Sequence, residues 1–422
     1  MASGSRTVRI RRGLDLDYPG APRQVIGAAA AVATVALLGS DYPGLRLEPL
    51  VAPGDPVKAG QALLRDRQHP DRHIVAPASG MVSALNRGPR RRVESLVLDV
   101  AGAATREFAL PGTLDRQALV GLLLASGLWA AIASRPFGRA ADLDSPPAAL
   151  FLTAMDSRPH AVDAAMVIAE HQAWFERGAR ALRLLTPGPC YLCHQAGHNP
   201  APLDDITPVG FAGPHPAGLP GTHIHHLHPV GRGQGLVWQI GYADVIALGH
   251  LLETGRIWAD RIIALSGPGL ADPVLLRVPP GARLQDLVAG RISPPRAILY
   301  SGSVLDGRVQ DYLARSHLQV FALHHHAPAA PLSPLVRRMQ AWMNAGIPAL
   351  IPNGVHERVA PPGILPIPLL RALSTGDVEL ARQLGALGLV EEDLALLSHV
   401  DGAGTDYGAM LRAMLDELAP RP

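Results

Sequence analysis

The sequence has few of the residues that mark whole classes of proteins. It contains two cysteines in 422 residues, which argues against a disulfide-rich fold and excludes an iron–sulfur cluster held by four thiolates. The formal charge is only +2 and no basic run is interleaved with aromatics, so nucleic acid is a poor candidate partner. Hydrophobic residues make up 48%, enough for a large core, which argues against intrinsic disorder.

Long apolar runs are also missing. The longest uncharged stretch, residues 117–134, is interrupted by Gln, Gly and Ser and is shorter than the roughly 20 apolar residues of a spanning helix. Arg11 and Arg12 precede an apolar run at 26–39, as in a twin-arginine signal, but Asp and Pro residues separate them and no cleavage site follows. We expect a cytoplasmic chain without a transmembrane helix.

Catalytic signatures are absent as well. There is no Walker A loop, no GxGxxG and no GxSxG, so no catalytic residue is predicted. The adjacent carboxylates at 204–205 and 391–392 do not face each other on a helix or strand, and we expect both pairs to be solvated. The basic cluster at 87–92 predicts a solvated hairpin turn, with contact to a membrane surface or an acidic partner as the alternative.

The most distinctive stretch of the sequence is residues 213–230, GPHPAGLPGTHIHHLHPV. Turn-forming Gly and Pro open this stretch, and four histidines lie between His223 and His228. On a strand His223 and His225 would share a face, which is half of many zinc sites, but the third ligand is not offered locally by Cys, Asp or Glu. We therefore expect a structural loop and strand and no metal site.

The two cysteines lie in CYLCH, Cys190 to His194, which matches the attachment pattern of c-type haem. The apolar residues between them have the alternating spacing of a short buried strand. We expect a strand in the core, with a redox, metal or haem role as the alternatives.

Residues 8–102 are short apolar runs separated by turns, typical of β-strands. Within them, 51–85 resembles the biotinyl/lipoyl barrel-sandwich family through V..GD.V..GQ.L followed by I.AP.SG.V. The carrier proteins of that family have a lysine at the hairpin tip, where this chain has His69. The scaffold is predicted without covalent biotin or lipoate.

The pattern then becomes α/β. Thr113 is expected to cap a helix ending near Gly127. Residues 148–154 are a continuous apolar run, as in a buried parallel strand, and 155–161 form the loop at its carboxyl end, where open α/β sheets place ligands. Further helices are expected at 161–178 and 242–254.

The pattern of residues 261–307 predicts a small β-grasp module. Residues 308–335 are expected to form a surface linker in which His324 to His326 are solvated. The leucine spacing beyond Pro366 predicts a helical region that ends at Leu418. The predicted fold is a multidomain α+β chain. Its expected parts are a barrel-sandwich hybrid domain (1–105), a Rossmann-like α/β domain (106–255), a β-grasp domain resembling soluble-ligand-binding modules (256–310), a linker region (311–365) and a helical C-terminal domain (366–422).

Taken together, these segments resemble one family nearly over the full length: the A subunits of the sodium-translocating NADH:quinone oxidoreductase. GPHPAG followed by GTH is the most specific feature, and His215, His223 and His225 belong to this family motif loop. The segments that carry the resemblance are GLDL with GAPRQVI (13–26), VALLGSDYPGLR (35–46), SGLWAAIASRPF (126–137), FLTAMDSRP (151–159), 213–230, DVIALG (244–249) and EEDLALLS with DYGAMLR (391–412).

The resemblance implies a peripheral subunit on the cytoplasmic side of the bacterial inner membrane, assembled with five integral-membrane and flavin-bearing subunits. The complex transfers electrons from NADH through flavins and an iron–sulfur centre in other subunits to ubiquinone, coupled to sodium export. This chain is expected to hold no cofactor. Where the related flavin subunit of respiratory complex I has a glycine-rich loop, residues 135–139 here contain a single glycine.

The family's association with ubiquinone is carried over to residues 129–139. Trp129 and Phe137 are predicted to line an apolar slot, and Arg135 or Arg139 to bond a quinone carbonyl. In the alternative, Phe137 lies in the core and both arginines pair with carboxylates such as Asp142 and Asp144. Two further functions stay open: a stand-alone metalloprotein built on the histidines, and a soluble small-ligand-binding protein.

Overall fold

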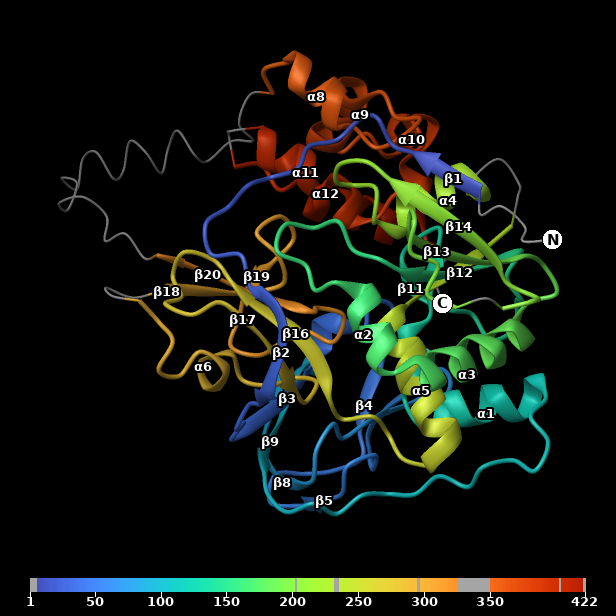
Figure 1. Cartoon of the computed structure of the whole chain (residues 1–422), viewed down its shortest axis with the longest axis vertical. Coiled ribbons are helices and arrows are strands. Elements are labelled where there is room, and N and C mark those ends of the chain that lie inside the picture. The colour runs from blue at the N-terminus through green and yellow to red at the C-terminus, as the bar shows by residue number, and fades with distance from the viewer. Residues whose placement is uncertain are drawn as a thin grey trace.

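The computed structural model describes residues 6–201, 203–230, 235–293, 297–324, 350–401 and 404–419. These residues form four β-sheets of seven, six, four and three strands together with helices, so the chain is a mixed α and β protein. Figure 1 shows the two small N-terminal sheets at the bottom, the six-stranded sheet at the left and the C-terminal helices at the top.

The two small sheets enclose a core of their own, which includes Leu63, Leu64, Leu96 and Leu98. Leu96 and Leu98 point into this core from one face of β9, and Val97 between them is also buried, at 8% exposure. The larger sheet has the order β3 (Thr34–Leu38), β9 (Val93–Val100), β8 (Gly80–Arg87), β5 (Pro56–Val57), and the smaller one β4 (Leu47–Pro49), β6 (Ala62–Asp66), β7 (His73–Val75).

The hairpin between β6 and β7, where a carrier protein would present its lysine, is packed against the next part of the chain. Arg72 is 5% exposed, pairs with Asp66 at 3.2 Å and donates to the carbonyl of Ala141 at 3.4 Å. The tip is therefore a fixed contact between two parts of the molecule.

The seven-stranded sheet is parallel except at one edge. Its order is β1 (Arg6–Arg9), β14 (Thr207–Ala212), β13 (Cys190–Gln195), β12 (Ala149–Ala154), β15 (Val237–Gly241), β10 (Ala133–Arg135), β11 (Arg139–Ala140), and the last two strands are antiparallel. From β12 the chain runs through β13 to β14 on one side and then returns to β15 on the other. The direction of winding reverses between β12 and β15.

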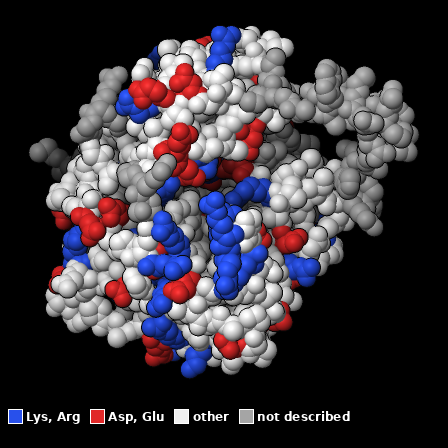
Figure 2. Space-filling view, turned by 180° about the vertical axis from the view of Figure 1, so that it is seen from behind, with Lys and Arg blue, Asp and Glu red and all other residues white. Residues whose placement is uncertain are grey.

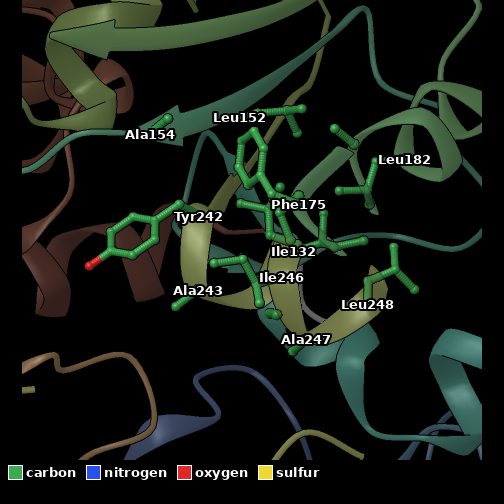
Figure 3. Packing of buried hydrophobic residues seen from close by; sticks show 14 of the residues in the cluster. Ile132, Leu152, Ala154, Phe175, Leu182, Tyr242, Ala243, Ile246, Ala247 and Leu248 are labelled. Atoms are coloured by element: carbon green, nitrogen blue, oxygen red, sulfur yellow. The ribbon is translucent and has the colours of Figure 1, made fainter. Parts of the chain in front are cut away.

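Both faces of this sheet are covered. Leu150 and Leu152 of β12 pack toward one core, and Ala149 and Phe151 toward another, which explains the continuous apolar run. The first core is shared with α1 (Arg116–Ala125), α2 (Ala164–Glu170), α3 (Gln172–Leu182) and α5 (Tyr242–Thr254), the second with α4 (Pro220–Leu227). Figure 3 shows Leu152, Phe175 and Ile246 packed together, with the Tyr242 side chain pointing away from them.

Helices α3 and α5 cross at glycine contacts. A Cβ on Gly249 would lie 1.7 Å from the carbonyl oxygen of Trp174, and one on Gly178 would lie 2.1 Å from that of Val245. Only glycine allows the two backbones to come this close.

The six-stranded sheet combines segments from distant parts of the chain. Its order is β19 (Arg308–Val309), β18 (Ala297–Ser301), β20 (Gln319–His324), β16 (Arg261–Ser266), β17 (Val274–Val278), β2 (Arg23–Ala29), and α6 (Leu284–Leu287) packs beside it. The C-terminal region consists of α8 (Gly354–Val359), α9 (Pro366–Thr375), α10 (Val378–Gln383), α11 (Glu391–Val400) and α12 (Tyr407–Leu418) around one hydrophobic cluster. Short 3-10 turns are η1 (Gly39–Asp41), η2 (Pro89–Arg91), η3 (Leu128–Ala131), η4 (Arg183–Leu185) and η5 (Ala386–Gly388).

Residues 6–29 cross the molecule before the small sheets begin. β1 pairs with β14, β2 pairs with β17, and between them the amide of Gly13 donates to the carbonyl of Arg358 at 2.8 Å. In Figure 1 this segment runs as a blue trace from β1, beside the C-terminal helices, down to β2. This segment contacts both large sheets and the C-terminal helices, although the sequence prediction assigned it to the N-terminal domain at 1–105. The domain boundaries stay a prediction.

Several local expectations are confirmed. The buried parallel strand at 149–154, the strand that contains both cysteines, the hairpin at 87–92 and the helix Tyr242–Thr254 are all present.

Others were wrong in detail. Asp115, not Thr113, caps α1, because its carboxylate accepts from the amide of Ala118 at 2.8 Å. The helix expected at 161–178 is two helices that meet at His171. Part of the expected linker at 308–335 forms β19 and β20, and His324 ends β20, whereas His325 and His326 lie outside the described residues.

Candidate functional site

A cleft of about 830 Å³ lies where the parallel strands of the large sheet end. Thr153 of β12 and Gly241 of β15 are register partners at this edge, and both line the cleft. Because the winding of the sheet reverses between these two strands, this is where open α/β sheets bind ligands. The hydroxyl oxygen of Thr153 is buried without a hydrogen-bond partner among the described residues.

The remaining walls come from other parts of the fold. Asp41 of η1, Asp306 from the loop after β18, Glu392 of α11 and Arg412 of α12 all line the cleft. Figure 2 shows Lys and Arg side chains gathered on both sides of a central hollow on one face of the molecule, with Asp and Glu side chains above it. The cleft is therefore both highly charged and built from segments far apart in sequence.

Arg158, in the loop after β12, is the centre of the charged cluster. Its Nε donates to Asp306 at 2.6 Å, its Nη1 to both oxygens of Asp156 at 3.1 and 3.2 Å, and its Nη2 to Glu392 at 2.5 Å. The guanidinium is thereby shared by three carboxylates. These carboxylates hold the pKa of Arg158 well above its usual value against the opposing effect of burial, and Arg158 in turn holds the pKa of Asp306 below its usual range although burial opposes it.

Arg135 at the end of β10 extends the cluster inward. It is fully buried and donates to Asp393 at 2.5 Å, to Glu392 at 3.3 Å and to the carbonyl of Gly388 at 3.0 Å. Two guanidinium groups thus face the carboxylates of Asp156, Asp306, Glu392 and Asp393. Burial, together with the neighbouring charge of Asp393, raises the pKa of Glu392 despite the pull of Arg158. The cluster joins the large sheet to α11.

The family motif loop forms the other side of this junction. His215 is 2% exposed; its amide donates to Asp15 at 2.9 Å and its Nδ1 lies 3.1 Å from the hydroxyl of Ser157. That hydroxyl accepts from the amide of Gly218 at 2.8 Å. The loop is thus tied to residues directly beside Arg158.

The strand expected for the histidines is wrong, because 220–227 form helix α4. Pro220 occupies its first turn, where its missing N–H costs nothing. His223 is fully buried on this helix, packs on Phe211 with ring centroids 4.2 Å apart, and has its Nε2 3.0 Å from the carbonyl of Ala217. His225 is exposed and packs beside Gly363. Residues 223 and 225 therefore do not share a face.

Neither thiol is placed to act with the other. Cys190 and Cys193 point to opposite faces of β13, into two different cores, and burial raises the pKa of Cys190 to about 12. Within the described ranges, no group of three or more His, Cys, Asp or Glu side chains is arranged to hold a metal ion.

Comparison with known proteins then decides the family. The chain is 43% identical to the A subunit of the Na(+)-translocating NADH-quinone reductase of Pseudomonas aeruginosa, over 96% of this chain and 98% of that one. The A subunits of the same reductase from Saccharophagus degradans and Serratia proteamaculans are 40% and 41% identical, each over 97% of this chain and 99% of their own length. The chain belongs to the NqrA family, the A subunits of Na(+)-translocating NADH-quinone reductases.

Models of the NqrA family also match three regions. They are described as the NqrA N-terminal barrel-sandwich hybrid domain (8–101), the NqrA second alpha/beta domain (114–257) and the NQRA C-terminal domain (262–311). The barrel-sandwich and α/β predictions are thereby confirmed. An NAD+-reducing NiFe hydrogenase structure is 14% identical over 65% of this chain and 57% of its own, but its TM-score of 0.34 is too low to indicate a shared fold. No helix in the described part of the chain has the length and apolar character needed to cross a membrane.

The four residues predicted for quinone lie in different environments within this NqrA fold. Arg139 lines the cleft, pairs with Asp416 at 3.0 Å and has its Nε buried without a partner among the described residues. Trp129 is fully buried, with its Nε1 donating to Ala141 at 2.9 Å, and Arg135 is the buried centre described above. Phe137 packs against the C-terminal helices. The cleft therefore contains one of the four.

The alternative, in which both arginines pair with carboxylates, matches this arrangement, but the partners are not the two named examples, Asp142 and Asp144. Arg135 pairs with Glu392 and Asp393. The expectation that Glu392 is solvated was wrong, since its side chain is 21% exposed and pairs with both Arg135 and Arg158. Glu391 stays 43% exposed and forms a bidentate pair with Arg412 at 2.6 and 2.8 Å.

The charged cluster was missed by sequence reasoning. Asp156 and Arg158 do lie in the loop that was predicted to face a ligand, so their position gave a signal. Asp306 and Glu392 gave none, because their importance comes only from contact with Arg158 across 148 and 234 residues.

Proposed function

We propose that this chain is the peripheral NqrA component of a membrane-bound, Na+-translocating NADH:ubiquinone reductase and supports ubiquinone reduction coupled to sodium export. The observation that carries the proposal is 43% identity to a protein of that name over 96% of this chain. Its partners are five further subunits, integral-membrane and flavin-bearing, and it acts on the cytoplasmic side of the bacterial inner membrane. It binds no cofactor of its own and no nucleic acid.

The finer fold description belongs to the same proposal. The 106–255 region is a Rossmann-like domain, supported by parallel strands whose winding reverses between β12 and β15 and by the match of the second alpha/beta domain to 114–257. The part at 256–310 is a β-grasp module, supported by the short helix α6, which packs beside its sheet. The part at 366–422 is a helical domain, supported by the hydrophobic core that α9, α11 and α12 share.

Ubiquinone contacts the cleft along the hairpin of β10 and β11. Ala130, Ala133 and Ala140 form a wall of small apolar side chains beside Leu45, and the partly exposed guanidinium of Arg139 adds N–H donors at its edge. A flat ring with carbonyl groups needs such an apolar surface with one well-placed donor. Trp129 and Arg135 support this wall from behind, since Trp129 packs on Trp238 of β15 and Arg135 donates to Gln239 at 3.3 Å.

The test is purification of the tagged chain from its native membranes in a mild detergent. Co-purifying hydrophobic subunits together with Na+-stimulated NADH:quinone activity are expected. The isolated chain alone should not oxidise NADH. Recovery of a lone chain from membranes that retain the activity would contradict the proposal.

A further inference from the structure

The hairpin between β8 and β9 ends in a concentrated basic tip. Four arginines, Arg87, Arg90, Arg91 and Arg92, lie within six residues, and all four are exposed. Among the described residues, none of them forms an ion pair with a carboxylate. The segment 86–95 contains one acidic residue, Glu94, so its formal charge is 4 − 1 = +3. Many arginines elsewhere on this molecule, including those of the cleft, are neutralised by Asp or Glu.

The tip has a defined backbone. The amide of Gly88 donates to Arg92 at 2.9 Å, and that of Arg91 donates back to Gly88 at 3.0 Å. Arg90 and Arg91 have φ angles of 57° and 59°, a left-handed conformation that costs free energy for any residue with a side chain. Non-glycine residues in this conformation persist where the surrounding structure enforces them and cluster at functional sites. The arginines are therefore displayed on a preorganised loop.

The base of the tip contacts the segment that leads into the cleft wall. The register places Ser95 of β9 opposite Leu38, and Gly39 packs so closely on the carbonyl of Val93 that a Cβ there would lie 1.9 Å from it. Gly39 begins η1, which ends at Asp41 in the cleft wall.

We propose that this arginine-tipped hairpin binds the anionic phospholipid headgroups of the membrane and so turns the cleft toward the bilayer. The inference rests on the proposed membrane-associated function. Guanidinium groups match phosphate oxygens in paired hydrogen bonds, and a cluster of unpaired cations is attracted to an anionic surface. A narrow tip suits entry between headgroups, whereas a stable contact with another protein needs about 800 Å² of surface per partner. A quinone leaving the bilayer would then meet the cleft directly.

The test is co-sedimentation of the purified full chain with vesicles of phosphatidylcholine, alone or with phosphatidylglycerol added. Binding should require phosphatidylglycerol and weaken as salt rises from about 50 to about 300 mM, because the attraction is electrostatic. Replacing the four arginines by glutamine should lower the partition coefficient at least about tenfold, since each cation near an anionic surface contributes roughly fivefold. Replacement by lysine should restore most of the binding.

The matched control removes four other exposed arginines from separate parts of the chain, Arg11, Arg67, Arg116 and Arg371, with the same change in net charge. It should bind within about twofold of the unaltered chain, since net charge alone does not concentrate cations at one point. Equal binding by both glutamine variants, or equal binding to neutral vesicles, would overturn the proposal. So would a tip variant that binds vesicles normally but no longer co-purifies with the other subunits, which would identify an acidic protein partner. Assembly of the tip variant in detergent tests the proposed function separately.

Discussion

The Nη2 atom of Arg158 lies 2.5 Å from a carboxylate oxygen of Glu392, although the two residues are 234 positions apart. Arg158 follows β12 of the large sheet and Glu392 lies in the first turn of α11. The same guanidinium also binds Asp306 in the loop after β18. One side chain therefore connects three parts of the chain at the cleft.

Arg158→Met should strongly destabilise the protein. The change leaves the carboxylates of Asp156, Asp306 and Glu392 close together without their shared cation, and breaking a buried ion pair in this way costs about 3–5 kcal/mol. Urea unfolding of the full chain measures the loss. Arg177→Met, which removes an exposed pair with Glu253, is the matched control and should change stability little.

Gly221→Ala should also destabilise, against the usual benefit of alanine in a helix. A Cβ at this position would lie 2.1 Å from a carboxylate oxygen of Asp393 and would force it away from Arg135. We expect a loss of about 1–3 kcal/mol in the free energy of unfolding. Gly121→Ala in α1 has open space around it and should instead stabilise by about 0.5–1 kcal/mol. The same sign for both variants in thermal melts would contradict this account.

The buried histidines predict loss of stability in mild acid. Burial, aided by the charge of Arg158, lowers the pKa of His215 to about 4, and burial lowers that of His223 to about 3. Below the ordinary value near 6.5, the unfolded chain binds protons that the folded chain does not. The stability that each group contributes above that ordinary value is therefore lost as the pH falls toward the folded-state values.

Each histidine should lower the free energy of unfolding by about 2 kcal/mol between about pH 7.5 and about pH 5. His223→Gln should remove its share of this slope, whereas His198→Gln, at an exposed position, should leave the slope intact. Urea unfolding at the two pH values is the measurement. A His223→Gln chain with the original pH dependence would show that another group is responsible.

Arg139→Gln should weaken quinone use by the assembled complex. Loss of one hydrogen bond to a quinone carbonyl should raise the KM for quinone roughly two- to tenfold. NADH oxidation by an artificial acceptor that bypasses the quinone should be unchanged. Arg180→Gln on the exposed face of α3 is the control. A KM equal to that of the unaltered complex would exclude Arg139 as a quinone contact.

The local residue pattern was enough to predict the helices and strands whose conformation depends mainly on their own residues. The run at 149–154 is apolar at nearly every position because both faces of β12 are covered, and the helix at 242–254 ends at Gly255 in the left-handed conformation expected of a C-cap. Helix or strand for 220–227 was not decided locally. Its histidines fit either period, and packing of Ile224 and His223 against the sheet selected the helix.

The family, the barrel-sandwich and α/β domains and the strongly periodic strands and helices follow from motifs and from neighbours within a few residues, so they could be predicted without coordinates. Three features could not: β1 and β2 join sheets far from their place in the chain, Trp129 and Arg135 are interior, and Arg158 meets Asp306 and Glu392. The physical reason is that an isolated charge carries no mark of its partner. Which carboxylate it meets depends on how separate segments pack, and that packing is set by the hydrophobic cores around them.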